Sequence, residues 1–271
     1  MKTIIKAILK KLLNPFLQRY YLLNNKLDCI INKLSLDNGI LELSEARLWV
    51  PNAPRDLIQN IQLSTYSFFE QDILQGIDNY LDKNSVILDL GANVGNHTVY
   101  WGKITKVKRI YSFEPVKATF KILSKNIEIN NLTDRVNIYN IGLGDKDSKG
   151  SIKGLYNVNA STIADSIGSL SINESIDGDI DIKKLDTYNE IIEEEKIDFV
   201  KIDVEGYEKK LLLGAVGFFK KHKPAIFIES FPGTDNYDFV KEYFQNRDYL
   251  MPIKYPGNNY LYIHKSYSRL I

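Results

Sequence analysis

The chain has 271 residues, which is enough for one large domain or for one domain with an appendage. Its 35 basic and 34 acidic residues give a net charge of +1, so we expect no nucleic-acid partner. One cysteine excludes an intrachain disulfide and a zinc site built from several thiolates. No run reaches the roughly 18 apolar residues of a spanning helix, and lysines interrupt the N-terminus, so we expect a cytoplasmic protein without a signal peptide.

The first 27 residues form a basic segment that contains no acidic residue. Apolar residues at helical spacing from Ile5 to Phe16, with lysines on the other side, predict an amphipathic helix. Such a helix can lie on an anionic membrane surface through residues 1–20, or pack on the rest of the chain or on a second subunit. Peripheral membrane contact and a homo-oligomer therefore both remain open.

Residues 1–80 are expected to form an N-terminal cap that consists of this helix, a hairpin and a further helix. Two apolar-rich runs flank Asp37-Asn38-Gly39, which is a typical hairpin turn, within residues 30–50. The pattern of residues 57–81 predicts one helix with Phe69, Ile73 and Ile77 on its buried face.

Predicted strands and helices alternate in residues 81–271. We expect strands at 86–90, 109–113, 136–140, 197–203, 224–229 and 258–264, and helices at 96–104, 116–131, 187–195, 206–221 and 235–246. This alternation predicts an α/β domain whose parallel sheet has helices on both faces. Residues 143–183 are expected to form an irregular insert with one hairpin, Gly150–Tyr156 against Gly178–Lys183.

A glycine turn, Gly91 to Gly95, lies between the first predicted strand and the next helix, and Glu114 follows the second strand. A strand, glycine turn, helix, strand and acid in this order predict a bound nucleoside cofactor. The turn lacks the middle glycine of dinucleotide sites, and Asp89 precedes it. A carboxylate there repels a pyrophosphate but attracts the sulfonium and ammonium groups of S-adenosyl-L-methionine. We expect Glu114 to accept hydrogen bonds from the two ribose hydroxyls.

Several sequence blocks together resemble the FkbM-type S-adenosylmethionine-dependent methyltransferases. In chain order they are Leu88–Gly95, Ser112–Pro115, Asn126 with Asn130-Asn131, Leu185-Asp186 and Ile197–Glu208, and the similarity runs from about Val86 to Glu229. The resemblance implies a class I methyltransferase fold, a Rossmann-like doubly wound sheet of seven strands with the last antiparallel. It also implies methyl transfer to a hydroxyl of a glycan, glycolipid precursor or natural product. Gly142 stands where such proteins usually carry alanine.

The turn, the second strand and the later blocks supply the expected cofactor contacts. The loop at Gly142 and Leu143 is expected to border the adenine. The predicted cofactor-binding residues are Asp89, Gly91, Ala92, Asn93, Gly95, Asn96, Glu114, Pro115, Gly142, Leu143 and Asp203.

Methyl transfer to an alcohol needs a base or a metal ion to remove the proton. Asp203 and Glu205 follow the fourth predicted strand and Glu229 ends the fifth, so all three are expected at one sheet edge. Asp203 and Glu229 resemble the magnesium ligands of catechol-type O-methyltransferases, so a bound Mg²⁺ is an alternative. His97 is a further candidate base, or packs beside the methionine end of the cofactor. His222 and His264 are expected at the surface.

Two other functions remain open. An NAD(P)-dependent oxidoreductase is disfavoured by Asp89 and by the missing middle glycine. A non-catalytic cofactor-binding assembly module is disfavoured because Asp89, Glu114 and Asp203 occur together.

Overall fold

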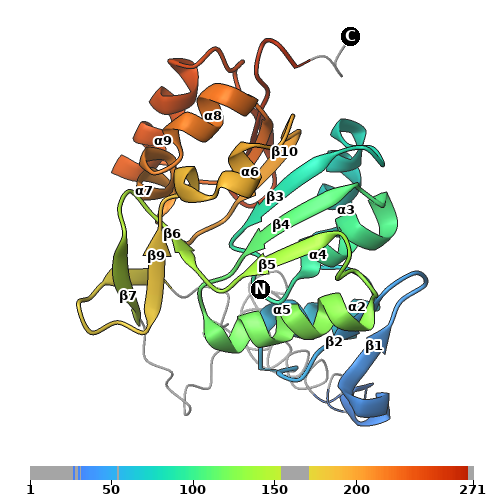
Figure 1. Cartoon of the computed structure of the whole chain (residues 1–271). Coiled ribbons are helices and arrows are strands. Elements are labelled where there is room, and N and C mark those ends of the chain that lie inside the picture. The colour runs from blue at the N-terminus through green and yellow to red at the C-terminus, as the bar shows by residue number, and fades with distance from the viewer. Residues whose placement is uncertain (1–26, 28–29, 31, 54, 154–170, 268–271) are drawn as a thin grey trace, which may run out of the picture.

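The computed structural model describes residues 27, 30, 32–53, 55–153 and 171–267. The predicted amphipathic helix and its membrane contact through residues 1–20 therefore lie outside the described residues. Within them, a central sheet carries helices on both faces, and a smaller sheet lies beside it (Figure 1). The predicted α/β class is confirmed.

Seven strands form the central sheet. They are β3 (Val86–Leu90), β4 (Arg109–Phe113), β5 (Val136–Tyr139), β10 (Phe199–Ile202), β11 (Ala225–Glu229), β12 (Ile253–Tyr255) and β13 (Asn259–Tyr262). Their spatial order is β12-β13-β11-β10-β3-β4-β5, and β13 runs opposite to the other six. The order reverses beside β3, which is where open α/β sheets bind ligands. The expected doubly wound sheet with an antiparallel last strand is confirmed, while the short, exposed β12 was not predicted.

Side chains alternate along the buried strands and supply two hydrophobic cores, one on each face of the sheet. In β3, Ile87 belongs to one core, whereas Leu88 and Leu90 belong to the other. Each of these three side chains is fully buried, which stabilises the fold by about 1.5–3 kcal/mol per side chain. The helices of the first face are α2 (Leu57–Thr65), α3 (Gln71–Ile77), α4 (Asn96–Tyr100) and α5 (Lys117–Ile129). Those of the second face are α6 (Asn189–Ile192), α7 (Glu208–Leu213), α8 (Val216–His222) and α9 (Asp235–Gln245).

The predicted N-terminal hairpin exists, but its turn was placed wrongly. Strands β1 (Ile40–Glu42) and β2 (Arg47–Trp49) pair antiparallel through a turn at residues 43–46. Asn38 and Gly39 adopt the positive φ values that their types favour, 51° and 72°. Because residues 32–35 before them are helical, these two residues end a helix instead of joining two strands.

Two asparagines of α5 hold this hairpin on the domain. Asn126 accepts a hydrogen bond from the Trp49 amide at 2.6 Å and donates one to the Val94 carbonyl at 2.8 Å. Asn130 accepts from the Arg47 amide at 2.9 Å and donates to its carbonyl at 2.7 Å. These side chains satisfy backbone groups on one edge of β2, which an edge strand otherwise leaves unpaired.

Residues 57–81 form two helices and not the one that was predicted. Helix α2 is capped by Asp56, whose carboxylate accepts the Gln59 amide at 2.9 Å. The chain then turns at Tyr66 and Glu70, with φ values of 51° and 56°, before α3 begins. Phe69 therefore lies in the turn instead of on a helical face.

The insert after β5 is more regular than predicted. It forms a four-stranded sheet of order β6-β9-β7-β8 from β6 (Gly142–Leu143), β7 (Ser148–Lys153), β8 (Ser171–Glu174) and β9 (Ile180–Lys183). Gly150 pairs with Ile180 in antiparallel β7 and β9, so the two segments of the predicted hairpin do pair. Tyr156, at the end of that prediction, lies outside the described residues.

The helix predicted at 206–221 is interrupted between α7 and α8. Gly214 lies at the break, and a Cβ atom there would lie 1.8 Å from the carbonyl oxygen of Gly144. The break thus lies where the chain packs closely on the segment that follows β6, and the apolar pattern of the helix does not reveal it.

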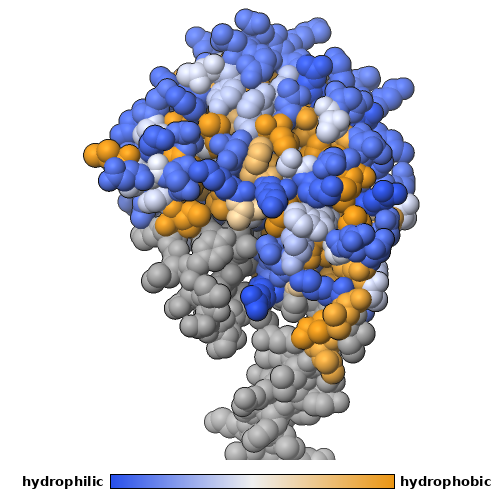
Figure 2. Space-filling view, turned by 60° about the horizontal axis from the view of Figure 1, so that its bottom comes forward, coloured by the Kyte–Doolittle hydropathy of each residue, from blue (hydrophilic) through white to orange (hydrophobic). Residues whose placement is uncertain are grey.

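The face of the molecule shown in Figure 2 is mainly hydrophilic, and its hydrophobic side chains form separate clusters. In the part of the chain that the structure describes, no helix is both long enough and apolar enough to cross a membrane.

Candidate functional site

Two adjoining cavities lie at the carboxyl ends of the central strands. The first, here named the Glu114 cavity, is bordered by Glu114 after β4, by Gly142 and Leu143, and by Ile172 and Ile182 of the small sheet. It encloses about 700 Å³ of space, part of it open to solvent. This volume is in the range of small-molecule sites.

The second, the Glu229 cavity, encloses about 1040 Å³, again with part open to solvent. Its walls include Phe69 and Glu70 from the N-terminal cap, His97 of α4, and Phe227 and Glu229 of β11. The two cavities share three lining residues, Asn93, Asp203 and Glu205. One elongated ligand can therefore extend from the first cavity into the second.

The glycine turn packs tightly on the loop that follows β10. Gly91 has φ +82°, and a Cβ there would lie 1.8 Å from the Asp203 carbonyl oxygen, so only glycine fits. Gly95 has φ +86°, and a Cβ there would lie 2.7 Å from a methyl carbon of Leu123. Gly91 lines the Glu114 cavity and Ala92 lines the Glu229 cavity. Gly95 lines neither cavity, and its lack of a side chain lets α5 pack against the turn.

Glu114 presents a buried carboxylate to its cavity. It accepts the Asn93 amide at 2.9 Å, the Val116 amide at 2.8 Å and the Thr119 hydroxyl at 2.9 Å. Burial raises the pKa of Glu114 above its ordinary value, although these hydrogen bonds act in the opposite direction. A carboxylate has about four acceptor positions, so one remains for a ligand hydroxyl.

Asp89 lies beneath the turn and lines neither cavity. It is fully buried and accepts the Thr98 hydroxyl at 2.6 Å. The Nζ atom of Lys201 lies 3.5 Å from Asp89 and 3.2 Å from Asp203, and donates to the Gly91 carbonyl at 2.7 Å. Burial lowers the pKa of Lys201, but the charges of Asp203 and Asp89 raise it above its ordinary value. Asp89 thus has Lys201 as its charged partner, and its predicted cofactor contact stays a prediction.

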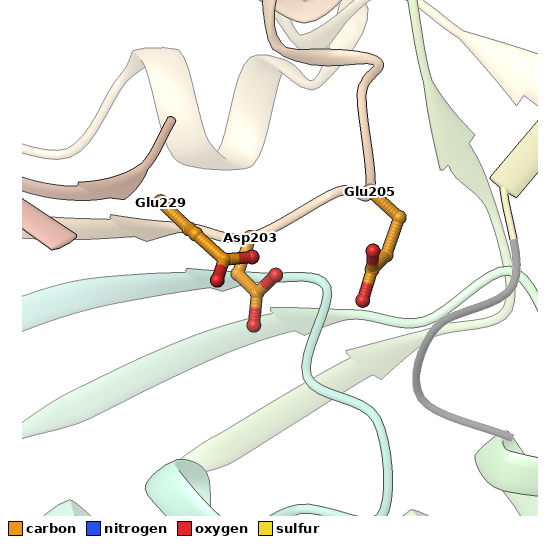
Figure 3. Close-up of side chains that lie close together, drawn as sticks. All are labelled: Asp203, Glu205 and Glu229. Atoms are coloured by element: carbon orange, nitrogen blue, oxygen red, sulfur yellow. The ribbon is translucent and has the colours of Figure 1, made fainter. Parts of the chain in front are cut away.

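Asp203, Glu205 and Glu229 converge where the cavities meet. Each offers a carboxylate oxygen, and the three oxygens lie within 4.8 Å of one another (Figure 3). Glu205 has a φ of 51°, a conformation that non-glycine residues rarely adopt outside functional sites or tight turns. Burial and the neighbouring Asp203 carboxylate raise the pKa of Glu205 to about 7, and raise that of Glu229 to about 8. Glu205 and Glu229 are therefore partly protonated near neutral pH, and a cation bound beside them would favour their ionised forms.

The cap reaches the glycine turn through Asn96. The Asn96 amide oxygen accepts from the Phe69 amide at 2.9 Å and from Gln62 at 2.8 Å, while its nitrogen donates to the Phe69 carbonyl at 2.9 Å. Glu70 then lies beside His97, with Oε2 at 3.5 Å from Nε2. Asn96 thus holds the cap against the turn and also lines the Glu229 cavity, and its predicted cofactor contact stays a prediction.

The other two histidines are buried, contrary to expectation. His222 accepts the Ile197 amide at 3.2 Å, and His264 contacts the Ser266 hydroxyl at 2.7 Å. Both have structural partners, and neither lines the cavities described above.

Most predicted site residues do come together. Those on the wall of one or both cavities are Gly91, Ala92, Asn93, Asn96, His97, Glu114, Pro115, Gly142, Leu143, Asp203, Glu205 and Glu229. Sequence reasoning missed Glu70 and Lys201. The first belongs to a segment interpreted as continuous helix, and the second was interpreted as an ordinary strand residue.

The strand order, the glycine turn and the paired cavities define a Rossmann-like α/β domain with the class I methyltransferase architecture. The profile of the methyltransferase FkbM domain matches residues 89–251, more than half of the chain. The chain therefore belongs to the FkbM methyltransferase family.

Two curated relatives are methyltransferases by name. Methyltransferase 1 of Beauveria bassiana is 28% identical over 146 residues, which are 48% of this chain and 58% of the relative. Methyltransferase sdnD of Sordaria araneosa is 28% identical over 161 residues, which are 49% of this chain and 61% of the relative. The chain thus matches about three fifths of the length of these relatives. A crystal structure of the FkbM methyltransferase from Methylobacillus flagellatus is 19% identical, with a TM-score of 0.48 over 76% of this chain and 52% of that one.

Proposed function

We propose that the protein is an S-adenosyl-L-methionine-dependent methyltransferase that acts on a hydroxyl of a glycan, glycolipid precursor or natural product. The observation that carries this proposal is the junction of the two cavities at Asn93, Asp203 and Glu205. When bound, S-adenosyl-L-methionine supplies a methyl group activated on a positively charged sulfur. Family membership supports methyl transfer as the class of reaction.

The described residues fit this cofactor. Glu114 keeps one acceptor position for a ribose hydroxyl, and Gly142 and Leu143 offer an apolar wall for the adenine. Where the cavities meet, the buried Oδ1 atom of Asn93 has no hydrogen-bond partner among the described residues. An unsatisfied buried acceptor is costly, and the cofactor's ammonium group can satisfy it. The carboxylates of Asp203 and Glu205 balance the cofactor's positive charges.

The turn is poorly suited to a dinucleotide. The amides of Gly91 and Ala92 both donate to the Phe113 carbonyl, at 3.0 and 2.9 Å, and the Asn93 amide donates to Glu114. A pyrophosphate is bound by free backbone amides of such a glycine turn and of the helix start, and these three amides of the turn are already hydrogen-bonded. The carboxylate cluster would also repel it. These contacts disfavour the NAD(P)-dependent alternative.

The walls of the Glu229 cavity support a neutral, hydroxyl-bearing acceptor. Apolar side chains from the cap and from the region of β11, including Leu57, Ile58 and Phe231, line it together with the carboxylates. Carboxylates accept hydrogen bonds from hydroxyl groups and repel phosphorylated molecules. We therefore expect methyl transfer to uncharged glycosides and not to sugar phosphates.

A magnesium ion at Asp203 and Glu229 stays a prediction. The structure adds Glu205 as a third oxygen donor. However, the cofactor's positive charges would occupy the same negative cluster, which weakens the need for a metal ion. We therefore propose that methyl transfer needs no metal ion and survives treatment with EDTA. If EDTA abolishes turnover and added Mg²⁺ restores it, a metal ion is required.

Ligand-induced thermal shifts test the cofactor assignment. S-adenosylhomocysteine at 100 times its Kd should stabilise the protein by about 2.7 kcal/mol, and NAD should give no shift. A shift with NAD alone would reject the proposal. Labelled S-adenosyl-L-methionine, offered with a panel of methyl glycosides and the matching sugar phosphates, then tests the acceptor class.

The pH dependence of binding tests the electrostatic role of the cluster. Because the pKa values of Glu205 and Glu229 are raised to about 7 and 8, both groups are partly protonated near neutral pH. A bound cation favours their ionised forms, so affinity should increase from pH 6 to pH 8.5 as protons are lost. S-adenosyl-L-methionine should show the larger increase, because S-adenosylhomocysteine lacks the sulfonium charge. If calorimetry shows the same pH dependence of affinity for both ligands, the sulfonium group does not bind at this cluster.

A further inference from the structure

A glutamate and a histidine from distant parts of the sequence meet on the wall of the Glu229 cavity. Glu70 precedes α3 in the cap, and His97 lies in α4 next to the glycine turn. Their side chains approach within 3.5 Å, and both line the cavity. Only 9% of the His97 side chain is exposed, so the imidazole is largely shielded from solvent.

The backbone around this pair is fixed before any ligand binds. The three hydrogen bonds of Asn96 clamp Phe69 next to Glu70, and Asn96 immediately precedes His97. Glu70 itself has a φ of 56°, a left-handed conformation that is uncommon for a non-glycine residue. Backbone strain of this kind persists at functional sites when the surrounding contacts fix it.

The chemistry of the contact fits a positioning carboxylate. Burial raises the pKa of Glu70, but the contact with His97 and the charges of His97 and Lys201 outweigh it and keep the pKa below the ordinary value. Glu70 is thus ionised where it faces Nε2 of the imidazole. A carboxylate at one ring nitrogen orients the ring and stabilises its protonated form.

We propose that His97 is the catalytic proton acceptor of the methyl transfer and that Glu70 is its positioning residue. This inference rests on the proposed methyltransferase function. As the O–H bond of the acceptor breaks, its proton moves to Nδ1 of His97, because Nε2 faces Glu70. The O–CH₃ bond forms while the bond between methyl carbon and sulfur breaks, and the electron pair of that bond stays on sulfur. The proton leaves His97 for solvent after the product departs.

The carboxylate cluster is less suited to this task once the cofactor is bound. Asp203 and Glu205 line both cavities, so they face the positive charges of the cofactor, and a paired carboxylate is a weaker base. His97 lines only the Glu229 cavity. Besides Glu70, the charged groups that face it across this cavity are Lys201 of β10, the cluster residues Asp203 and Glu205, and Glu229 of β11.

Nuclear magnetic resonance of the histidine rings tests the pair without any acceptor. The chain has three histidines, so the ring nitrogens of each can be followed separately. In Glu70→Gln, the ring-nitrogen chemical shifts of His97 alone should change, because Nε2 loses the carboxylate that faces it. Asp72→Asn, which removes an exposed carboxylate two residues away in α3, should leave all three rings unchanged.

Kinetics with a glycoside that the wild-type protein methylates test the catalytic role. His97→Gln should lower kcat about 100-fold or more, the usual contribution of a general base. Glu70→Gln should lower kcat about 10-fold, because the imidazole loses the carboxylate that orients it. Glu70→Asp, which keeps the charge, should recover most of the rate. The Kd of S-adenosylhomocysteine should change less than threefold in each variant.

Two outcomes would overturn the inference. If the ring-nitrogen shifts of His97 are the same in wild type and Glu70→Gln, Glu70 does not act on the ring. If His97→Gln keeps its kcat, another group takes the proton. Failure of the proposed function differs from both, because wild-type protein would then not bind S-adenosylhomocysteine while the ring-nitrogen shifts would still show the pair.

Discussion

The two cavities are built in different ways. The Glu114 cavity is lined by residues 90–207, with the glycine turn and the second strand in one unbroken stretch of chain. The Glu229 cavity brings that stretch together with Leu57, Ile58, Phe69 and Glu70 of the cap, which precede the family-matched range. The comparison teaches that the Glu114 cavity is built entirely within the range that matches the family profile. The Glu229 cavity depends in addition on how the cap docks on that range.

The largest effect that sharpens this contrast is expected at the glycine turn. Gly91→Ala places a Cβ against the Asp203 carbonyl, at 1.8 Å in the present backbone, and should cost about 3 kcal/mol or more of stability and abolish binding of S-adenosylhomocysteine. Gly206→Ala is the matched control, because Gly206 has a similar φ of +92° but no atom within 4 Å of a new Cβ. Strain alone should cost it about 1–2 kcal/mol in urea denaturation. If both variants lose the same free energy of unfolding, the contact with the Asp203 carbonyl is not the reason why position 91 requires glycine.

The next effect is expected in the Glu114 cavity. Glu114→Ala removes the carboxylate that would bind ribose and leaves the Asn93 and Val116 amides without their acceptor. The affinity for S-adenosylhomocysteine should fall about 100-fold by calorimetry. Glu128→Ala, at an exposed position on α5, should leave it unchanged. If Glu114→Ala binds S-adenosylhomocysteine as tightly as the wild type does, the nucleoside does not bind in this cavity.

A smaller effect is expected at Asn96, and it should affect one cavity more than the other. Asn96→Ala deletes the three hydrogen bonds that clamp Gln62 and Phe69, at a cost of about 2 kcal/mol of stability. Turnover of the acceptor should fall, while the Kd of S-adenosylhomocysteine should change less than threefold. A matching loss of cofactor affinity would break the comparison, since docking of the cap would then govern both cavities.

The smallest effect is a gain of stability. The pKa of Glu229 is raised to about 8 in the folded protein, so its folding contribution is favourable below its ordinary pKa and is lost as the pH rises to 8. Glu229→Gln should therefore be more stable than wild type at pH 8.5, by about 1 kcal/mol after allowance for solvent screening, and equally stable at pH 4. Thermal unfolding at the two pH values measures this difference. A variant that is less stable than wild type at pH 8.5 would show that Glu229 is held by favourable contacts.

The sequence predicted the parts of the molecule that are local in the chain. The bounds of β3 and β4, the glycine turn and Glu114 follow from apolar runs and residue types within about 30 residues. Glu70 did not follow, because its helical surroundings conceal a break that only the docking of Phe69 on Asn96 produces. The pairing of Asp89 with Lys201 did not follow either, because Lys201 lies 112 residues away in the sequence. Long-range neutralisation of charge leaves no local pattern.

The surroundings of His97 also give the protein an optical reporter. The ring of Trp101 lies 5.5 Å from that of His97. The other tryptophan of the chain, Trp49, has its indole beside Gly39 at the start of the hairpin. Changes around the proposed base can therefore be followed by the fluorescence of Trp101 once Trp49 is replaced.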